Sequence, residues 1–406
     1  MNSSRKGVAS VGRATGPGGG QPAGPGVAIA AVGLSLIAVC YGLARFAYGL
    51  FVPVLRDEFG LDRATAGAIA ASSYVGYCGA IVAAMVLTAR WGARPVAAIA
   101  GLTATVGTGL IAAAPTTQAL AIGVVIAGSS TGLASPPLAD AVARGVRAVR
   151  RDRVQTVVNA GTGLGVMTSG PVALMVQESW RLAWWIFAAV AAVVTLWTAL
   201  TLPARRGSPC DGHGSRFPPS LLPAGVGRLL AAATLMGLAS SAVWTFGRDI
   251  AVTTGGVSLQ ASTIMWIVLG GAGLLGACAG DIVGRIGLSS GWTAGMLALA
   301  CATACFALAS SSYPLLLIGA ATFGAVYIAL TGVLLLWGTY AYSASPAFGV
   351  GAAFLLIAAG QAIGSLVIGN LVDLAGQRTA FLAAAAVAAT AASLTPGSFA
   401  APVDSG

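Results

Sequence analysis

A polar stretch at Pro203–Ser220 divides an otherwise strongly apolar chain into two halves of nearly equal length. The 406 residues are 57% hydrophobic and only 8% charged, whereas an ordinary soluble protein carries roughly a quarter charged residues. So few charges cannot cover a water-facing surface of this size. The chain is therefore predicted to lie largely within a lipid bilayer.

The apolar residues form about six runs on each side of this stretch, and a helix of roughly 20 residues crosses a bilayer core. Strands are excluded because the runs are apolar on every face and do not alternate. A helix also satisfies its own backbone polar groups within lipid. The predicted spans are 27–55, 65–88, 95–114, 118–141, 155–176, 182–202, 224–246, 259–279, 291–310, 313–338, 348–371 and 379–395.

The net charge of +10 can be interpreted once each basic residue is assigned to the inner or the outer side of the predicted spans. With the N-terminus inside, the outer side holds only Arg56, Arg63, Arg181, Arg248 and Arg378. The inner side holds many more: Arg5, Lys6, Arg13, Arg90, Arg94, Arg144, Arg147, Arg150, Arg151, Arg153, Arg205, Arg206, Arg216 and Arg285. This excess follows the positive-inside rule and predicts that both termini are cytoplasmic. Nucleic-acid binding gains no support from it.

These features predict an all-α polytopic membrane protein with a defined domain order. We expect a disordered cytoplasmic tail at 1–26, a six-helix bundle at 27–202 and a cytoplasmic linker at 203–222. A second six-helix bundle at 223–395 and a short cytoplasmic tail at 396–406 follow. The 20-to-1 ratio of Arg to Lys is typical of a GC-rich bacterium, so the bacterial cytoplasmic membrane is the expected location.

Matching features recur in the two halves, as a duplication predicts. GLARFAYG at Gly42 resembles GLASSAVW at Gly237, and the turn at Gly92 resembles the one at Gly284. Three glycines of the fifth span recur in the eleventh at one constant offset: Gly161, Gly165 and Gly170 against Gly360, Gly364 and Gly369. Because each half would contain an even number of helices, the repeat is parallel.

At these residues the chain resembles the major facilitator superfamily, whose members have twelve helices in two six-helix bundles. The family's turn between helices 2 and 3 reads Gly-x-x-x-Asp-Arg-x-Gly-Arg-Arg. Its counterparts here are Arg90, Gly92 and Arg94 in the first half and Asp281, Gly284 and Arg285 in the second.

The resemblance extends to helices 4 and 5. Helix 4 carries Gly128, Gly132 and Pro136 at the family's spacing, and Gly170-Pro171 in helix 5 resembles the glycine-proline motif of antiporters. The resemblance implies alternating access, with the helix 2–3 turns and Gly170-Pro171 in gating roles. It also implies proton coupling.

Arg45 stands near the middle of the first span, where a guanidinium costs roughly 2.5–3.5 kcal/mol on insertion scales. Such a residue should face a cavity or a partner. Tyr41 and Tyr48 lie four residues before and three after it, so they share its helix face. A fixed cation with two hydroxyls suits a carboxylate or another oxyanion. We predict that Arg45 binds the substrate, and a gating or structural role is the alternative.

Other polar or aromatic residues within the spans are candidates for lining the same cavity, although each could instead serve helix packing. They are Tyr74, Tyr77, Trp244, Tyr327, Thr331 and Gln361.

Proton coupling usually requires a buried carboxylate. Most acids fall in or beside the outer loops: Asp57, Glu58, Asp62, Glu178, Asp249 and Asp373. Asp140 lies within the fourth span, and Arg144 one turn later makes an ion pair the expected state.

Other classes of protein fit less well. An ATP-driven pump would need a phosphate-binding loop with a lysine, but Lys6 is the only lysine. A membrane-embedded enzyme would gather His, Cys, Asp or Glu, whereas the sole histidine, His213, lies in the linker. Cys301 and Cys305 share a face without further ligands, so no metal or cofactor is expected. A channel or a non-transporting sensor remains as a distant alternative.

The sequence therefore predicts a secondary active transporter that moves a small solute, with the lipid bilayer, that solute and protons as its partners and the monomer as its working unit. Arg45 favours a small organic anion as substrate. Gly170-Pro171 favours the alternative, a drug or metabolite efflux antiporter.

Overall fold

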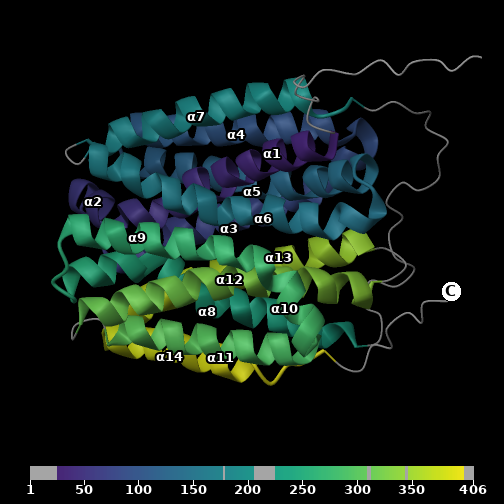
Figure 1. The fold of residues 1–406 in the computed structure, drawn as a ribbon. Coiled ribbons are helices and arrows are strands. Elements are labelled where there is room, and N and C mark those ends of the chain that lie inside the picture. The colour runs from purple at the N-terminus through teal and green to yellow at the C-terminus, as the bar shows by residue number, and fades with distance from the viewer. Residues whose placement is uncertain (1–24, 177–178, 205–224, 309–311, 343–345, 397–406) are drawn as a thin grey trace, which may run out of the picture.

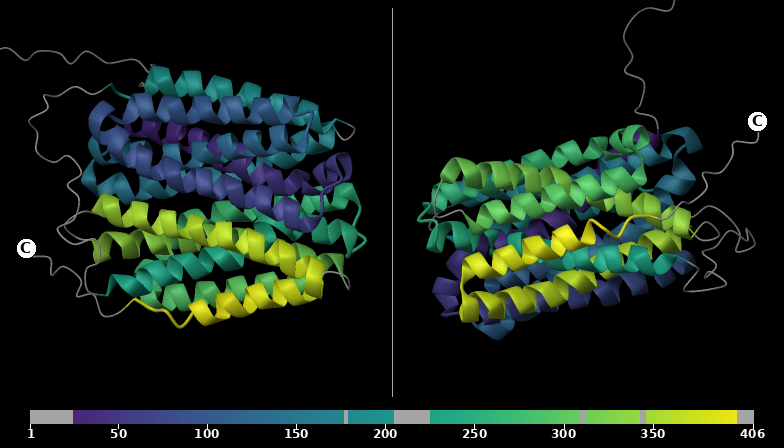
Figure 2. Two further views of the ribbon diagram at one scale, coloured as in Figure 1. Left: turned by 180° about the vertical axis from the view of Figure 1, so that it is seen from behind. Right: turned by 90° about the horizontal axis from the view of Figure 1, so that it is seen from below.

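The computed structural model describes residues 25–176, 179–204, 225–308, 312–342 and 346–396. The described residues are helical and form two bundles that lie side by side (Figure 1), a division that is also clear from behind (Figure 2, left). The predicted tails and nearly all of the predicted linker lie outside the described residues. The first described helix begins, and the last one ends, at the same end of the molecule, called the terminal end below.

The first bundle opens with one long bent segment made of α1 (Pro25–Ile37), the π-helix η1 (Ala38–Phe46) and α2 (Ala47–Phe59). It continues with α3 (Arg63–Trp91), α4 (Ala93–Ala113), α5 (Thr117–Gly145), α6 (Ala148–Met175) and α7 (Trp180–Thr201). The second bundle contains α8 (Val226–Thr253), α9 (Leu259–Gly273), the 3₁₀ turn η2 (Leu274–Cys278), α10 (Ala279–Ile286), α11 (Leu288–Ala307), α12 (Tyr313–Ala341), α13 (Pro346–Ala375) and α14 (Gln377–Ala391).

Four helices that start at the end opposite the termini have side-chain caps that satisfy free backbone N–H groups. The capping residues are Asp62, Thr116, Ser179 and Ser258. Asp62 accepts a 2.7 Å hydrogen bond from the backbone N–H of Thr65. Hydrogen bonding to Thr65 holds the pKa of the Asp62 carboxyl below its ordinary value.

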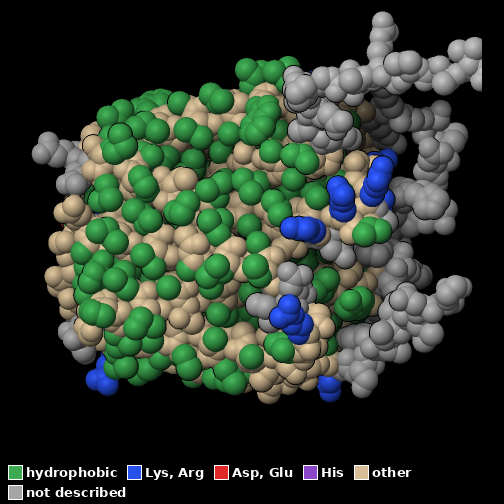
Figure 3. All heavy atoms as spheres, in the orientation of Figure 1, with side chains coloured by type: hydrophobic (Ala, Val, Ile, Leu, Met, Phe, Trp, Pro, Cys, Tyr) green, Lys and Arg blue, Asp and Glu red, His purple; other side chains and the backbone are tan. Residues whose placement is uncertain are grey.

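Ten segments of the described chain are long and apolar enough to cross a membrane, judged by length and composition. The other two long segments are α6 and α14, and α14 has only 15 residues. Together they give the twelve segments that the sequence predicts. Apolar side chains are spread over the whole face in Figure 3, and Lys and Arg gather mainly toward its right-hand, terminal end.

The predicted spans agree with these segments except at a few boundaries. Two of the largest differences are in α6, which begins at Ala148 although the predicted span begins at 155, and in α8, which continues to Thr253 although the predicted span ends at 246. The extra turns of α8 carry Arg248 and Asp249, which are both buried, whereas the sequence places them in or beside an outer loop. The prediction was wrong there because charged residues indicate a helix end unless their partners are known.

The repeat is visible in how the glycines of α6 and α13 pack. A Cβ atom on Gly161 or Gly165 would collide with a carbonyl of the first crossing segment, at Leu34 or Ala38. Gly360 and Gly364 meet α8 in the same way, at Thr234 and Leu238. The third pair faces the opposite bundle, since Gly170 meets Ile267 of α9 and Gly369 meets Arg63 of α3. These contacts are equivalent in the two bundles.

Two other sequence matches are out of register. Gly42 packs on Gly165, whereas Gly237 packs on Ile357 and Gln361, one to two turns before Gly364. The helix ends also differ from the predicted match, because the counterpart of Gly92 (φ 86°) is Gly287 (φ 82°), which separates α10 from α11. Gly284 lies inside α10. Glycine is frequent enough in this chain that short matches align by chance.

We predict that Gly165→Ala destabilises the protein by about 1–3 kcal/mol, because the new methyl group would force α6 away from η1. The same change at Gly79 of α3 is the matched control, since nothing lies within 4 Å of a Cβ there. Gly79→Ala should be neutral or stabilising by about 0.5–1 kcal/mol. Thermal unfolding of both variants in detergent measures the difference, and equal behaviour would contradict this account of the packing.

Candidate functional site

Arg45 lies in η1, the π-helical segment halfway along the first crossing, and is only 6% exposed. π-helical turns are rare and often occur at functional sites. Gly42 lies in the same segment and allows its backbone to approach Gly165 of α6 more closely than any side chain would permit. The wide turn and this glycine contact together set the position of Arg45 in the protein interior.

Four aromatic rings surround the Arg45 guanidinium. Its Cζ atom lies 4.4 Å from the ring centre of Tyr74, 4.7 Å from Phe46, 4.9 Å from Tyr77 and 5.8 Å from Tyr41. Each ring face attracts a cation at such distances. The structure thus brings three predicted site residues, Tyr41, Tyr74 and Tyr77, around the predicted cation.

A hydrogen-bond chain continues from Arg45 into the second bundle. Its Nη2 donates to Oε1 of Gln361 on α13, a residue that is fully buried. The Gln361 Nε2 donates to the Tyr327 hydroxyl at 3.1 Å and lies 3.4 Å from Oγ of Ser240. The bond between Arg45 and Gln361 therefore joins the two bundles at the centre of the molecule.

Arg45 makes no ion pair within the part of the chain that the structure describes. Its Nε is also buried without a hydrogen-bond partner among those residues. The charge is balanced by ring faces and an amide oxygen instead of a carboxylate. The guanidinium therefore keeps a donor that no described residue accepts from.

Trp244 of α8 stacks on Phe46, with ring centres 3.9 Å apart and planes inclined by 23°. Tyr327, Phe323 and Trp266 meet Trp244 edge to face, at 5.2, 5.5 and 6.0 Å. This aromatic layer draws on both bundles and lies beside Arg45 toward the end opposite the termini. It separates the Arg45 site from that end.

A small cavity of about 20 Å³ borders Arg45. Its lining includes Tyr41, Tyr77, Tyr327 and Thr331, which the sequence predicted as cavity residues. Two lining residues, Ile37 and Ile357, lie closer to the terminal end than Arg45 and Gln361, because their helices start at that end. Thr331 also lies closer to the terminal end than Tyr327, because α12 ends there. The cavity therefore lies on the terminal side of the aromatic layer.

The sequence reasoning missed two polar lining residues, Asn159 and Thr162 of α6. They flank Gly161 on a predicted span, and polar side chains within an apolar run are the signal that could have identified them. Ser135 was also missed, and its Oγ lies 2.7 Å from the Tyr41 hydroxyl.

Tyr48 lies apart from this group, contrary to the helical spacing that placed it on the face of Arg45. Its hydroxyl donates to the carbonyl oxygen of Ala66 on α3 at 3.0 Å. The π-helical turn of η1 changes the angular relation between residues on its two sides. The regular helix assumed from the sequence therefore misplaced Tyr48.

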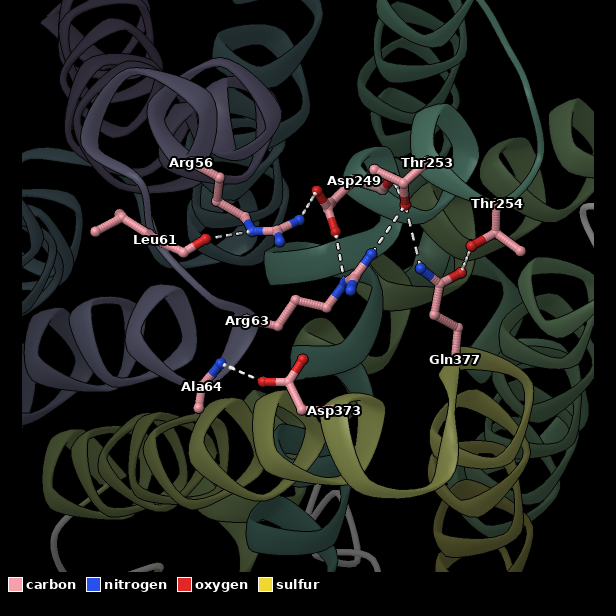
Figure 4. A network of polar contacts seen from close by, with 9 residues as sticks. All are labelled: Arg56, Leu61, Arg63, Ala64, Asp249, Thr253, Thr254, Asp373 and Gln377. Carbon is pink, nitrogen blue, oxygen red and sulfur yellow. Dashed lines mark hydrogen bonds and ion pairs between the residues drawn. The ribbon is translucent and has the colours of Figure 1, made fainter.

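A second polar group joins the bundles at the end opposite the termini (Figure 4). Asp249 of α8 is fully buried, with Oδ1 2.7 Å from Nη1 of Arg56 and Oδ2 3.1 Å from Nε of Arg63. Asp373 of α13 accepts a 3.0 Å hydrogen bond from the backbone N–H of Ala64. All three contacts connect the first bundle to the second, so this end is closed.

Arg248 strengthens the same closure. Its side chain is 4% exposed and donates to the carbonyl oxygen of Leu50 in the first bundle. It also donates to Oγ of Ser262 at 3.0 Å and to Oγ1 of Thr263 at 2.9 Å, both on α9. Sequence reasoning could not find this role, because the partners lie on other helices.

The residues predicted for gating lie mostly at the terminal end. Arg90 and Arg94 flank Gly92 at the join of α3 and α4. In the second bundle Gly284 and the exposed Arg285 lie in α10, and nothing is described of the Asp281 side chain. Gly170 and Pro171 lie within α6, where Gly170 faces Ile267 of α9.

Asp140 and Arg144 pair along one face of α5, with Arg144 Nε 2.8 Å from Asp140 Oδ1. Both residues lie near the terminal end of α5, and the Arg144 side chain is 61% exposed. The pair lies within one bundle and does not connect the two.

The comparisons with known proteins agree with this geometry. The model of the family described as "Uncharacterised MFS-type transporter YbfB" matches residues 37–395. A search of curated protein sequences gives no significant match.

Three solved structures illustrate the similarity of fold. The human organic anion transporter MFSD10 (TETRAN) is 17% identical with a TM-score of 0.69, covering 92% of this chain and 100% of that chain. The nucleoside transporter NupG is 17% identical with a TM-score of 0.68, covering 91% and 97%. A bacterial homologue of the human lysosomal transporter Spinster, in an inward-facing and occupied conformation, is 16% identical with a TM-score of 0.69, covering 92% and 97%.

At these identities the solved structures show the fold alone, a bundle of membrane-spanning helices. The family model shows membership of the family as well as the fold, because it matches most of the chain. The protein therefore belongs to the MFS-type transporters and is a multi-pass membrane protein of the secondary transporter class.

Proposed function

We propose that this protein carries a small organic anion across the bacterial cytoplasmic membrane by alternating access, as a monomer with both termini in the cytoplasm. The observation that carries this proposal is the buried Arg45, which has aromatic and amide partners but no carboxylate within the described chain. The anion would supply the missing counter-charge.

The energetics favour this role for Arg45. Each cation–π contact contributes about 0.5–2 kcal/mol, and together they offset the cost of a guanidinium at mid-membrane. A carboxylate adds more, because a guanidinium binds it through two charge-assisted hydrogen bonds. The unpartnered Nε is a donor that such a ligand could use, and the adjacent small cavity would have to widen to admit it. One structural neighbour is described as an organic anion transporter, which is the same class of substrate.

The two ends of the molecule support alternating access. Asp249, Arg56 and Arg63 join the bundles at one end, and the cavity lies on the terminal side of the aromatic layer. With the termini in the cytoplasm, this arrangement would correspond to a state closed to the outside. Opening to the outside would then require these ion pairs to break while new contacts form at the terminal end.

Efflux of an amphipathic compound is the second candidate function. The aromatic rings of Trp244, Phe323 and Tyr327 favour it, since flat apolar ligands stack on such surfaces. An efflux carrier for neutral or cationic compounds would not depend on the charge of Arg45, which distinguishes it from the first proposal.

The proposed function does not include proton coupling, which an experiment can test directly. The described acidic side chains lie toward the two ends of the bundles, as Asp249 and Asp140 illustrate. Uptake into proteoliposomes driven by a pH gradient alone measures whether protons are coupled.

We predict that Arg45→Ala and Arg45→Lys each lower anion uptake by about 100-fold or more, because the first removes the charge and the second its forked geometry. Uptake of labelled lactate and gluconate into proteoliposomes measures the effect. These anions cross lipid slowly without a carrier.

Tyr48→Phe is the control, since Tyr48 is close to Arg45 in sequence but bonds to Ala66 of α3. It should keep uptake within about twofold of the wild type, because one neutral hydrogen bond contributes only about 1 kcal/mol. Normal uptake by the Arg45 variants would refute anion binding by Arg45 and favour the efflux candidate.

We predict that Asp249→Asn weakens the closure at the end opposite the termini, because Arg56 and Arg63 both lose their carboxylate. Breaking a buried pair of this kind costs about 3–5 kcal/mol. Spin labels on cysteines at the exposed positions Asp57 and Arg378 should then show a longer distance, measured by pulsed electron resonance.

Asp140→Asn is the matched control for this experiment. It removes an exposed ion pair within one helix and should leave the label distance unchanged. An unchanged distance in Asp249→Asn as well would mean that these ion pairs do not hold the bundles together.

A further inference from the structure

The bond between Arg45 and Gln361 connects the two bundles at the centre of the proposed binding site. Arg45 belongs to η1 of the first bundle, and Gln361 belongs to α13 of the second. A substrate anion that takes the Nη2 group of Arg45 replaces Gln361 as its acceptor. The amide oxygen of Gln361 therefore stands where a carboxylate oxygen of the cargo would be expected.

The orientation of the Gln361 amide is set by its other contacts. Its Nε2 donates to the hydroxyl of Tyr327 at 3.1 Å and lies 3.4 Å from Oγ of Ser240. These partners belong to α12 and α8, so three helices of the second bundle hold the amide in one orientation. With its nitrogen engaged there, Gln361 can present only its oxygen to Arg45.

A neutral amide is a weaker acceptor for a guanidinium than a carboxylate. The cargo anion can therefore displace Gln361 from Arg45, whereas a glutamate at the same position would compete as a permanent counter-ion. An apolar residue there would leave the Nη2 group of Arg45 buried without an acceptor whenever the carrier is empty. The glutamine accepts a hydrogen bond from Arg45, as a glutamate would, but carries no charge, like an apolar residue.

We propose that Gln361 is a built-in substitute for the anionic cargo, which lets the empty carrier close around Arg45 and return across the membrane. This inference rests on the proposed function, because it takes Arg45 as the anion-binding group. It assigns a specific mode of transport. The protein moves one anion without a second anion on the return path, and Gln361 is the residue that makes this possible.

The first test compares net efflux with exchange. Proteoliposomes loaded with labelled lactate or gluconate are diluted into buffer without anion, which requires empty return, or into buffer with the same unlabelled anion, which does not. Wild type should show both activities. In Gln361→Leu, net efflux should fall about tenfold or more, because the empty site loses a charge-assisted bond.

Exchange in Gln361→Leu should fall much less than net efflux, since exchange does not require the empty carrier to close around Arg45. The matched control is Gln260→Leu, the same change at an exposed position of α9. It should leave both rates unchanged. Equal loss of net efflux and exchange in Gln361→Leu, or no loss of either, would overturn the proposal.

The second test needs no substrate. Gln361→Glu should raise the apparent melting temperature by about 3 °C or more with Arg45 present and lower it in an Arg45→Gln background. Gln260→Glu, the exposed control, should behave alike in both backgrounds. Absence of coupling between positions 45 and 361 would refute the bridge whatever the cargo is.

The two tests separate the failure of this inference from the failure of the proposed function. If wild type moves none of the anions but the stability cycle shows coupling, the anion proposal fails and the contact between Arg45 and Gln361 stands as a structural bridge only. If wild type moves an anion and Gln361→Leu retains normal net efflux, the transport proposal stands and the role of Gln361 is wrong.

Discussion

The burial of one cation without an acidic partner among the described residues shapes the centre of this transporter. Arg45 lies away from water, so its charge must be stabilised by the protein. Four ring faces and the oxygen of Gln361 provide that stabilisation, and the last comes from the other bundle. Close packing of η1 on α6, at Gly42 and Gly165, holds the cation in place. The charge of one residue thus ties together the two halves of the chain, which would have to move apart under the proposed alternating access.

The two contacts between the bundles differ in chemical character. At the end opposite the termini a fully buried carboxylate, Asp249, meets two arginines. At the centre a cation meets a neutral amide. Ionic contacts are costly to separate once desolvated, whereas the weaker central bond can be replaced by a charged ligand. This difference suits the proposed function, in which a bound anion would favour one arrangement of the bundles.

Hydropathy and charge placement alone were sufficient to predict the twelve segments and the two bundles, because lipid selects apolar helices at every span. The same reasoning singled out Arg45, since a charge within an apolar run stands out. It could not place Tyr48, Asp249 or the helix join at Gly287. Their positions depend on a π-helical turn, a longer α8 and a shifted helix end, and none of these has a clear signal in the sequence.

Which residues face Arg45 was decided only by the tertiary structure. Tyr74, Gln361 and Tyr327 come from three helices far apart in the chain, and only their packing brings them together around one charge. Periodicity reports which residues share a face of one helix, but it carries no information on which faces of different helices meet. The segments therefore follow from composition, whereas the site follows from the packing between the bundles.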